Sequence, residues 1–106
     1  NIILASVAPK KDAIASGLNE VATIISSGCN APGLLLEDCN AAFIEIYNNA
    51  DIIISKGQGN YEALSEEENI FFLLKAKCSI IASRLQCNLN DYILKFSKLN
   101  KYIKIK

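Results

Sequence analysis

Residues 56–60 read Lys-Gly-Gln-Gly-Asn, directly after a run of three isoleucines, and could together bind an anion. Glycines allow backbone N–H groups to approach an anion closely, lysine adds a point charge, and asparagine both donates and accepts hydrogen bonds. Lys77 ends a second apolar run and would be costly to bury without a partner. The pattern predicts contacts to a phosphate-like or sugar-like group. A tight glycine-rich turn and a lysine that reaches solvent at the rim are the alternatives.

No established phosphate signature fits this stretch. GxGxxG needs a glycine where Glu62 stands, and a Walker loop needs Gly-Lys-Ser/Thr after four intervening residues. Three polar stretches, at residues 27–30, 56–62 and 77–78, each follow a predicted strand. In open α/β sheets, ligands lie beyond the carboxyl ends of the strands. We therefore expect the three stretches to converge at one edge of a parallel sheet.

Length and composition indicate one globular domain over residues 1–106. The 106 residues are 51% apolar and 21% charged, with zero net charge and no apolar run long enough to span a bilayer. Residues 98–106 form a lysine-rich tail, but no aromatic platform for bases accompanies it. These features argue against nucleic-acid and membrane partners.

Histidine is absent, which excludes a histidine-based triad or metal site. The spacings of Cys29, Cys39, Cys78 and Cys87 match no zinc motif. We interpret them as free, mostly buried thiols in a reducing cytoplasm, with disulfides as the alternative.

Apolar patterning predicts alternating strands and helices. A strand-like residue composition favours β-structure, and three- and four-residue apolar steps favour a helix. The expected strands are residues 1–7, 20–27, 50–55, 69–78 and 91–96, and the expected helices are residues 10–17, 34–49 and 79–86. Continuous apolar runs at 50–55 and 69–78 are typical of parallel strands covered on both faces. The chain is therefore expected to be an α/β domain with right-handed crossovers.

Three segments, in order and spacing, resemble the carboxyl-terminal part of the damage-control phosphatase family, the ARMT-like proteins long listed as a domain of unknown function. They read ISSGCNAPGLLLEDC, ADIIISKGQGNYEALSEE and NIFFLLKAKCSIIASRL. The resemblance is best to the archaeal and bacterial branch and covers roughly residues 12 to 97. It implies a Rossmann-like α/β/α sandwich with a mostly parallel sheet, of which this chain would be an incomplete half.

The resemblance also implies a metal-dependent phosphatase that acts on phosphorylated small metabolites. A divalent ion such as manganese, cobalt, nickel or magnesium would hold the substrate phosphate and activate water. By position, residues 58–62 correspond to the substrate-contacting loop and Lys77 to a lysine that meets the substrate. The full set of expected substrate-binding residues is Ser27, Gly28, Asn30, Lys56, Gly57, Gln58, Gly59, Asn60, Tyr61, Glu62 and Lys77. Cys29 lies in the same loop as the first three.

The sequence departs from the family pattern at the metal ligands. The Asp-Asn-x-Gly-Glu motif should lie upstream of residue 1, and Ser6-Val7 stands where a second aspartate is expected. The chain is then either a fragment of the enzyme or a diverged, non-catalytic relative that still binds a phosphorylated ligand. In both cases we expect no metal to be held by this chain alone and little or no activity.

A half-sheet would leave an open strand edge and an uncovered apolar face. Such an edge presents unpaired backbone groups to another chain. We therefore expect dimerisation or strand exchange, with a homodimer through the open sheet edge as one form.

Overall fold

Five strands form a single sheet in the computed structural model, which describes residues 2–6, 9–97 and 102–105. The strands are β1 (Ile2–Ala5), β2 (Ile52–Lys56), β3 (Ile70–Lys75), β4 (Tyr92–Phe96) and β5 (Tyr102–Ile105), and they lie in sequence order across the sheet. β1, β2 and β3 are mutually parallel, β4 is antiparallel to β3, and β5 is antiparallel to β4. Four strands therefore run in one direction, which confirms the expected α/β class with a mostly parallel sheet.

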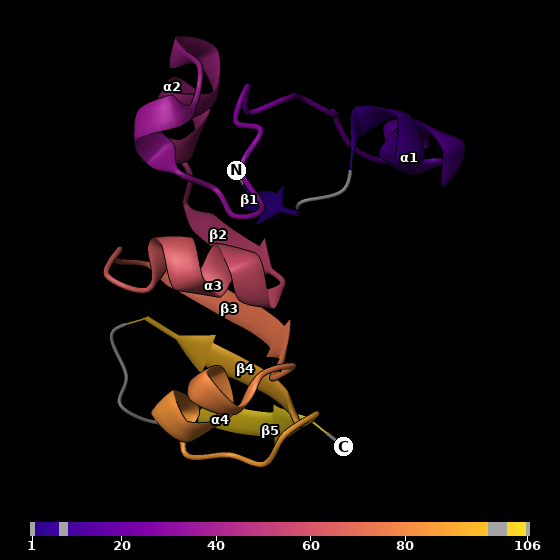
Figure 1. Cartoon of the computed structure of the whole chain (residues 1–106). Helices are drawn as coiled ribbons and strands as arrows, with labels where there is room; N and C mark the ends of the chain where they lie inside the picture. The colour runs from indigo at the N-terminus through magenta and orange to yellow at the C-terminus, as the bar shows by residue number, and fades with distance from the viewer. Residues whose placement is uncertain (1, 7–8, 98–101, 106) are drawn as a thin grey trace.

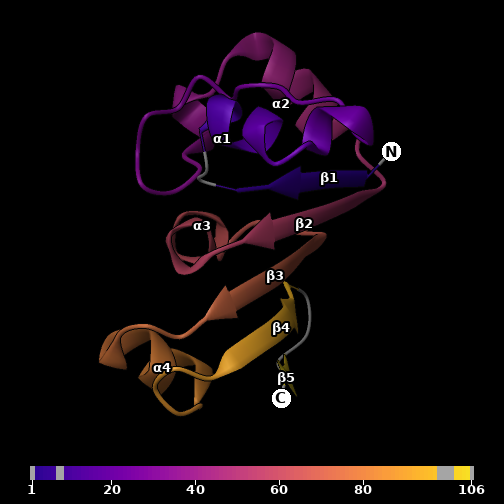
Figure 2. The same cartoon turned by 90° about the vertical axis from the view of Figure 1, so that its right-hand side faces the viewer.

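Helices lie between successive strands from β1 to β4 in the chain and pack mainly on one face (Figure 1, Figure 2). They are α1 (Lys10–Ala15), α2 (Ala41–Asn48), α3 (Gln58–Leu64) and α4 (Ser79–Leu85), with short 3-10 turns η1 (Leu18–Glu20) and η2 (Leu36–Asp38). In Figure 1, α3 lies in front of β2 and β3, and α4 lies in front of the β4 and β5 strands. Figure 2 shows both helices on the left of the sheet and α1 and α2 beyond β1.

One continuous core joins this helical layer to the sheet. Alternating residues of the strands face the helices, because successive side chains of a strand point to opposite faces. The core consists of Leu34, Phe43, Tyr47, Ile53, Tyr61, Leu64, Ile70, Phe72, Leu74, Ile81, Leu85 and Ile93. α1 contributes no buried residue to it.

The opposite face of the sheet is apolar and largely open. Ile2 pairs with Ile52, Ile54 with Phe71, and Phe71 with Phe96, so these side chains share the face that the core does not use. Ile2, Leu4, Ile52, Phe71 and Tyr92 are all exposed there. The described residues therefore hold one well-packed helical layer of the expected sandwich.

The strand predicted over residues 20–27 is wrong. Leu18–Glu20 forms the 3-10 turn η1, and residues 23–30 have no regular structure. β1 pairs directly with β2, so this segment does not lie between them, and it is not among the five strands of the sheet. Val21 is 83% exposed, which shows that β-branched composition without a pairing partner does not make a strand.

The helix predicted over residues 34–49 starts later than expected. η2 occupies residues 36–38, Cys39 is extended, and α2 begins at residue 41. The Asn40 side chain accepts a hydrogen bond from the Phe43 backbone N at 2.8 Å, and this cap sets the start of α2.

Two further elements differ from the expectation. Residues 58–62, expected as a loop, are the first turns of α3. β5 lies within the predicted lysine-rich tail, 98–106, and was not expected. Residues 98–101 and 106 of that tail, and residues 1 and 7 of the first predicted strand, lie outside the described residues.

Candidate functional site at the β2–β3 edge

The carboxyl ends of β2 and β3 place two of the three predicted polar stretches side by side. β2 ends at Lys56, β3 ends at Lys75, and the two strands are parallel. The backbone N of Gly57 donates to the Leu73 carbonyl at 2.9 Å, which extends the strand pairing to the start of α3. Gly57 adopts φ +101°, a conformation that strongly favours glycine. The chain can therefore turn sharply from β2 into α3.

Gln58 joins the two strand ends directly. Its Oε1 accepts a hydrogen bond from the Lys77 backbone N at 2.8 Å, and its Nε2 lies 3.5 Å from the Cys78 Sγ. The first residue of α3 is thus tied to the segment before α4. Lys56 and Lys77, which flank this contact in the sequence, are both exposed residues.

Asn60 lies inside the protein rather than at its surface. It is 1% exposed; its Oδ1 accepts from the Leu34 backbone N at 2.9 Å, and its Nδ2 donates to the Lys56 carbonyl at 3.0 Å. These bonds satisfy buried backbone groups on two segments. In this arrangement, the Asn60 amide links the strand end and the loop at Leu34 to α3.

Tyr61 is also a core residue. Its ring meets that of Phe72 edge-on, with the centroids 5.1 Å apart, and the Lys95 Nζ lies 5.9 Å from its centroid. Burial raises the pKa of the Tyr61 phenol; Arg84 lowers it and Glu66 raises it further. Of the residues expected in the substrate-contacting loop, Asn60 and Tyr61 therefore form the support, while Gln58 lies at the edge.

The third predicted stretch, residues 27–30, does not follow a strand. The Asn40 backbone N donates to the Ser27 carbonyl at 2.7 Å, and Gly28 adopts φ +79°. Asn30 is exposed. Residues 27–30 were expected at the same sheet edge as the other two polar stretches because a strand was predicted before them. That strand is not formed.

The loop reaches α3 through a close backbone contact. A Cβ added to Gly33 would clash with the Gly59 carbonyl oxygen, and a Cβ added to Gly59 would clash with the Pro32 carbonyl oxygen. Only glycine fits at either position without a shift of the backbone. The glycines in the Ala-Pro-Gly and Gly-Gln-Gly segments could have signalled such a contact, and the sequence reasoning missed it.

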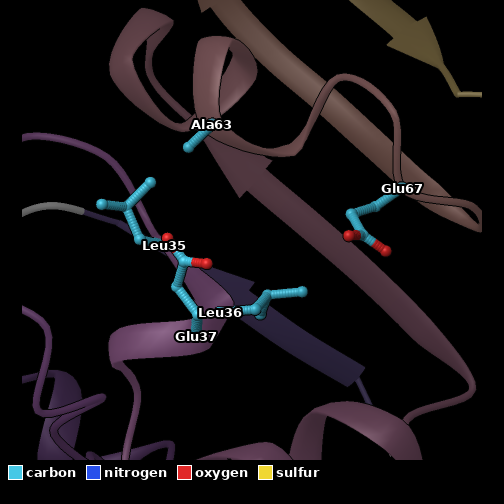
Figure 3. A pocket seen from close by; sticks show the side chains of 5 residues that line it. All are labelled: Leu35, Leu36, Glu37, Ala63 and Glu67. Carbon is cyan, nitrogen blue, oxygen red and sulfur yellow. The ribbon is translucent and has the colours of Figure 1, made fainter.

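Two shallow hollows lie along this contact. One, of about 320 Å³, is lined by Ala31, Pro32, Gly33, Leu35, Gly59, Glu62 and Ala63. The other, of about 220 Å³, is lined by Leu35, Leu36, Glu37, Ala63 and Glu67, and Figure 3 shows Glu37 and Glu67 on opposite sides of it. Carboxylates repel a phosphate, so these hollows suit an anion less well than the lysine-bearing edge does.

Metal ligands do not gather in the described part of the chain. Among these residues, no three or more cysteine, aspartate or glutamate side chains lie close enough together to hold a metal ion. The residues at the β2–β3 edge offer ammonium and amide groups instead, which bind anions. They do not fit a divalent cation by themselves.

Comparison with known proteins places this arrangement in one family. The sequence model of the damage-control phosphatase ARMT1-like domain matches residues 1–93. A damage-control phosphatase of Pyrococcus horikoshii is 47% identical over 73 residues, which are 67% of this chain and 25% of that protein. An uncharacterised protein of Methanocaldococcus jannaschii is 37% identical over 89 residues, 79% of this chain and 29% of that protein.

The fold is shared with a solved structure. A DUF89 family protein of Pyrococcus horikoshii superposes with a TM-score of 0.80 at 36% identity, covering 92% of this chain and 37% of that chain. The chain therefore spans less than a third of the curated relatives named above. No described helix has the length and apolar character needed to cross a bilayer.

Proposed function

The chain belongs to the ARMT1-like damage-control phosphatase family, and from this premise we propose that it supplies the substrate-binding edge of a metal-dependent phosphatase. The proposed substrates are phosphorylated small metabolites. The observation that supports the proposal is the hydrogen bond between Gln58 and the Lys77 backbone. It ties the start of α3, two residues after the exposed Lys56, to the segment that carries the exposed Lys77.

In this proposal, two lysine side chains make the main contacts to the substrate phosphate. The Lys56 and Lys77 ammonium groups would bind phosphate oxygens through charge-assisted hydrogen bonds. The Gly57 turn lets the backbone approach the ligand, and the Gln58 amide fixes the position of Lys77. Glu62 and the residues Ser27, Gly28 and Asn30 are proposed as outer contacts to the rest of the substrate, and Gly59, Asn60 and Tyr61 as its support.

The metal is proposed to come from polypeptide other than the described residues, since their carboxylates and thiols do not cluster. A manganese, cobalt, nickel or magnesium ion would supply charge neutralisation and an activated water in the complete enzyme. We accordingly propose that this chain alone has little or no phosphatase activity. The proposal also assigns it to the cytoplasm, in keeping with four free cysteines, and gives it no nucleic-acid or membrane partner.

A binding module without turnover is the second candidate. The observation that favours it is the chemistry of the same edge, which offers ammonium and amide groups. No group of three or more possible metal ligands is found among the described residues. Such a module would hold a phosphorylated ligand and release it unchanged.

Phosphate titration followed by amide NMR tests the proposed edge. We expect inorganic phosphate to shift the amide signals of Gln58 and Lys77, and Lys77→Ala to weaken binding about tenfold or more through loss of a charged contact. Lys75→Ala is the matched control, because its ammonium lies 5.5 Å over the Tyr92 ring instead. Equal phosphate affinity in the two variants would contradict the assignment of Lys77.

A further inference from the structure

Cys29 and Cys39 lie on neighbouring segments of the fold. Cys29 follows Gly28 in the loop before η2, and Cys39 precedes the capping residue of α2. The Ser27 carbonyl accepts from the Asn40 backbone N at 2.7 Å, and a Cβ on Gly28 would lie 3.4 Å from the Asn40 Cβ. The residues adjoining the two cysteines are therefore in contact.

Both thiols point into the turn that connects these segments. The Cys29 Sγ lies 3.5 Å from the Gly33 carbonyl, and the Cys39 Sγ lies 3.3 Å from the Leu35 carbonyl. The Ser27 hydroxyl accepts from the Cys29 backbone N at 3.1 Å. Both side chains are half-buried, so a small thiol reagent can reach them.

The electrostatics agree with this proximity. Burial raises the pKa of the Cys39 thiol, a Cys29 thiolate raises it further, and a hydrogen bond from the Ser27 side chain lowers it.

We propose that Cys29 and Cys39 are a redox pair that closes to an intramolecular disulfide and locks the loop at residues 27–39. With a glutathione disulfide as oxidant, the Cys29 thiolate attacks one of its sulfurs, and one glutathione thiolate leaves. The Cys39 thiolate then attacks the Cys29 sulfur of the mixed disulfide, and the second glutathione leaves. Two protein thiols are oxidised and one disulfide oxidant is reduced to two thiols.

The disulfide would act on α3 through the loop. Gly33 rests against Gly59, and the Leu34 backbone N donates to Asn60. Local opening of residues 27–34 detaches these contacts from the helix. A crosslink restricts the open state, so oxidation reduces the opening of the segment that supports α3.

The other two cysteines provide an internal control. Cys78 caps the start of α4 and Cys87 lies two residues beyond its end. A seven-residue helix is about 10 Å long, which exceeds the Cα separation that a disulfide tolerates. These cysteines cannot pair with each other without unwinding α4.

Peptide mapping of the full chain tests the pair. Cleavage after glutamate at Glu20, Glu37 and Glu45 separates Cys29 from Cys39. After incubation with oxidised glutathione, we expect one disulfide-linked peptide pair from residues 21–37 and 38–45. Cys39→Ser should abolish it, and the double variant Cys78→Ser/Cys87→Ser should retain it. Closure should also accelerate with pH beyond the ordinary thiol range, since Cys39 must lose its proton.

Hydrogen exchange gives the second measurement. The Leu34 amide should exchange at least about tenfold more slowly in the oxidised chain than in the reduced chain. Wild-type chain that ends with Cys29 and Cys39 each bound to glutathione, or with either paired to another cysteine, would overturn the proposal. So would an unchanged Leu34 exchange rate in chain that carries the disulfide.

Discussion

Asn60 shows how a residue in an apparent ligand motif can hold the site together. Its amide makes hydrogen bonds to the Leu34 and Lys56 backbones while only 1% exposed. The sequence pattern Lys-Gly-Gln-Gly-Asn therefore combines exposed groups with a buried support. Distinguishing the two required the fold, because both kinds of residue are polar and consecutive.

Replacement of Asn60 by alanine should destabilise the chain by about 2–3 kcal/mol, since buried backbone donors and acceptors lose their partners. Asn49→Ala is the control: its side chain donates to the Glu45 carbonyl at an exposed site. Urea unfolding should show a loss of less than about 1 kcal/mol for the control. Similar losses in both variants would show that the Asn60 amide is not a structural link.

The raised pKa of Tyr47 should lower the stability of the folded chain at alkaline pH. Burial, and secondly the Glu67 carboxylate, raise the pKa of Tyr47 from 10.0 to about 12. The folded state therefore favours the neutral phenol. Its contribution to the free energy of unfolding is fully present below pH 10 and is lost as the pH rises from 10 through 12.

The free energy of unfolding of Tyr47→Phe should lie within about 0.5 kcal/mol of the wild-type value at pH 7, because the buried hydroxyl has no hydrogen-bond partner among the described residues. At pH 11 the variant should be more stable than wild type in urea. Tyr92→Phe, which changes an exposed ring, is the control for general alkaline effects. Identical pH profiles for wild type and Tyr47→Phe would contradict the assigned cause.

At the scale of elements, the apolar strands β2 and β3 could be predicted from the sequence, whereas the segment at residues 20–27 and the helix α3 could not. β2 and β3 were predictable from their continuous apolar runs, but the expectation that both faces are covered was wrong: Ile52 and Phe71 are exposed on the second face. Gly17, at φ +81°, ends the first helical segment as expected. The false strand at residues 20–27 had the right composition but no partner. α3 was missed because glycines at residues 57 and 59 suggested a turn, whereas the first makes the turn and the second makes a close contact.

Gly57, which precedes α3, and Gly59, in the first turn of α3, should respond differently to alanine. Gly59→Ala places a Cβ against the Pro32 carbonyl, whereas Gly57→Ala meets open space but must keep φ +101°. We expect each to cost about 1–3 kcal/mol in urea unfolding. Only Gly59→Ala should accelerate hydrogen exchange at Leu34, because it alone separates the loop from α3. Faster Leu34 exchange in both variants would contradict this division.

At the scale of the whole molecule, the sheet has one packed face and one open face. The open face carries exposed Ile2, Leu4 and Phe71, and β1 pairs with only one strand among the described residues. Apolar patches and free strand edges both favour association. The expected homodimer through this edge stays a prediction.

Leu4→Lys should weaken that association, because a charge on an edge strand opposes pairing with a second copy. Leu4 is 57% exposed in β1, and Val21, 83% exposed outside the sheet, offers a matched control as Val21→Lys. Sedimentation equilibrium should give a dimer for wild type and Val21→Lys and at least a tenfold larger dissociation constant for Leu4→Lys. A wild-type monomer at all accessible concentrations would contradict the prediction.

Hydrolysis by a chimera tests the central claim most directly. In the damage-control phosphatase of Pyrococcus horikoshii, the segment that matches this chain would be replaced by the corresponding residues of this chain. With divalent metal and an aryl phosphate, the chimera should be active, and Lys77→Ala should lower its kcat/KM by about tenfold to a hundredfold, or about 1.4–2.8 kcal/mol. Lys75→Ala should leave kcat/KM within about twofold. A folded chimera without activity, or equal activity of the two lysine variants, would contradict a phosphate-binding role for the β2–β3 edge.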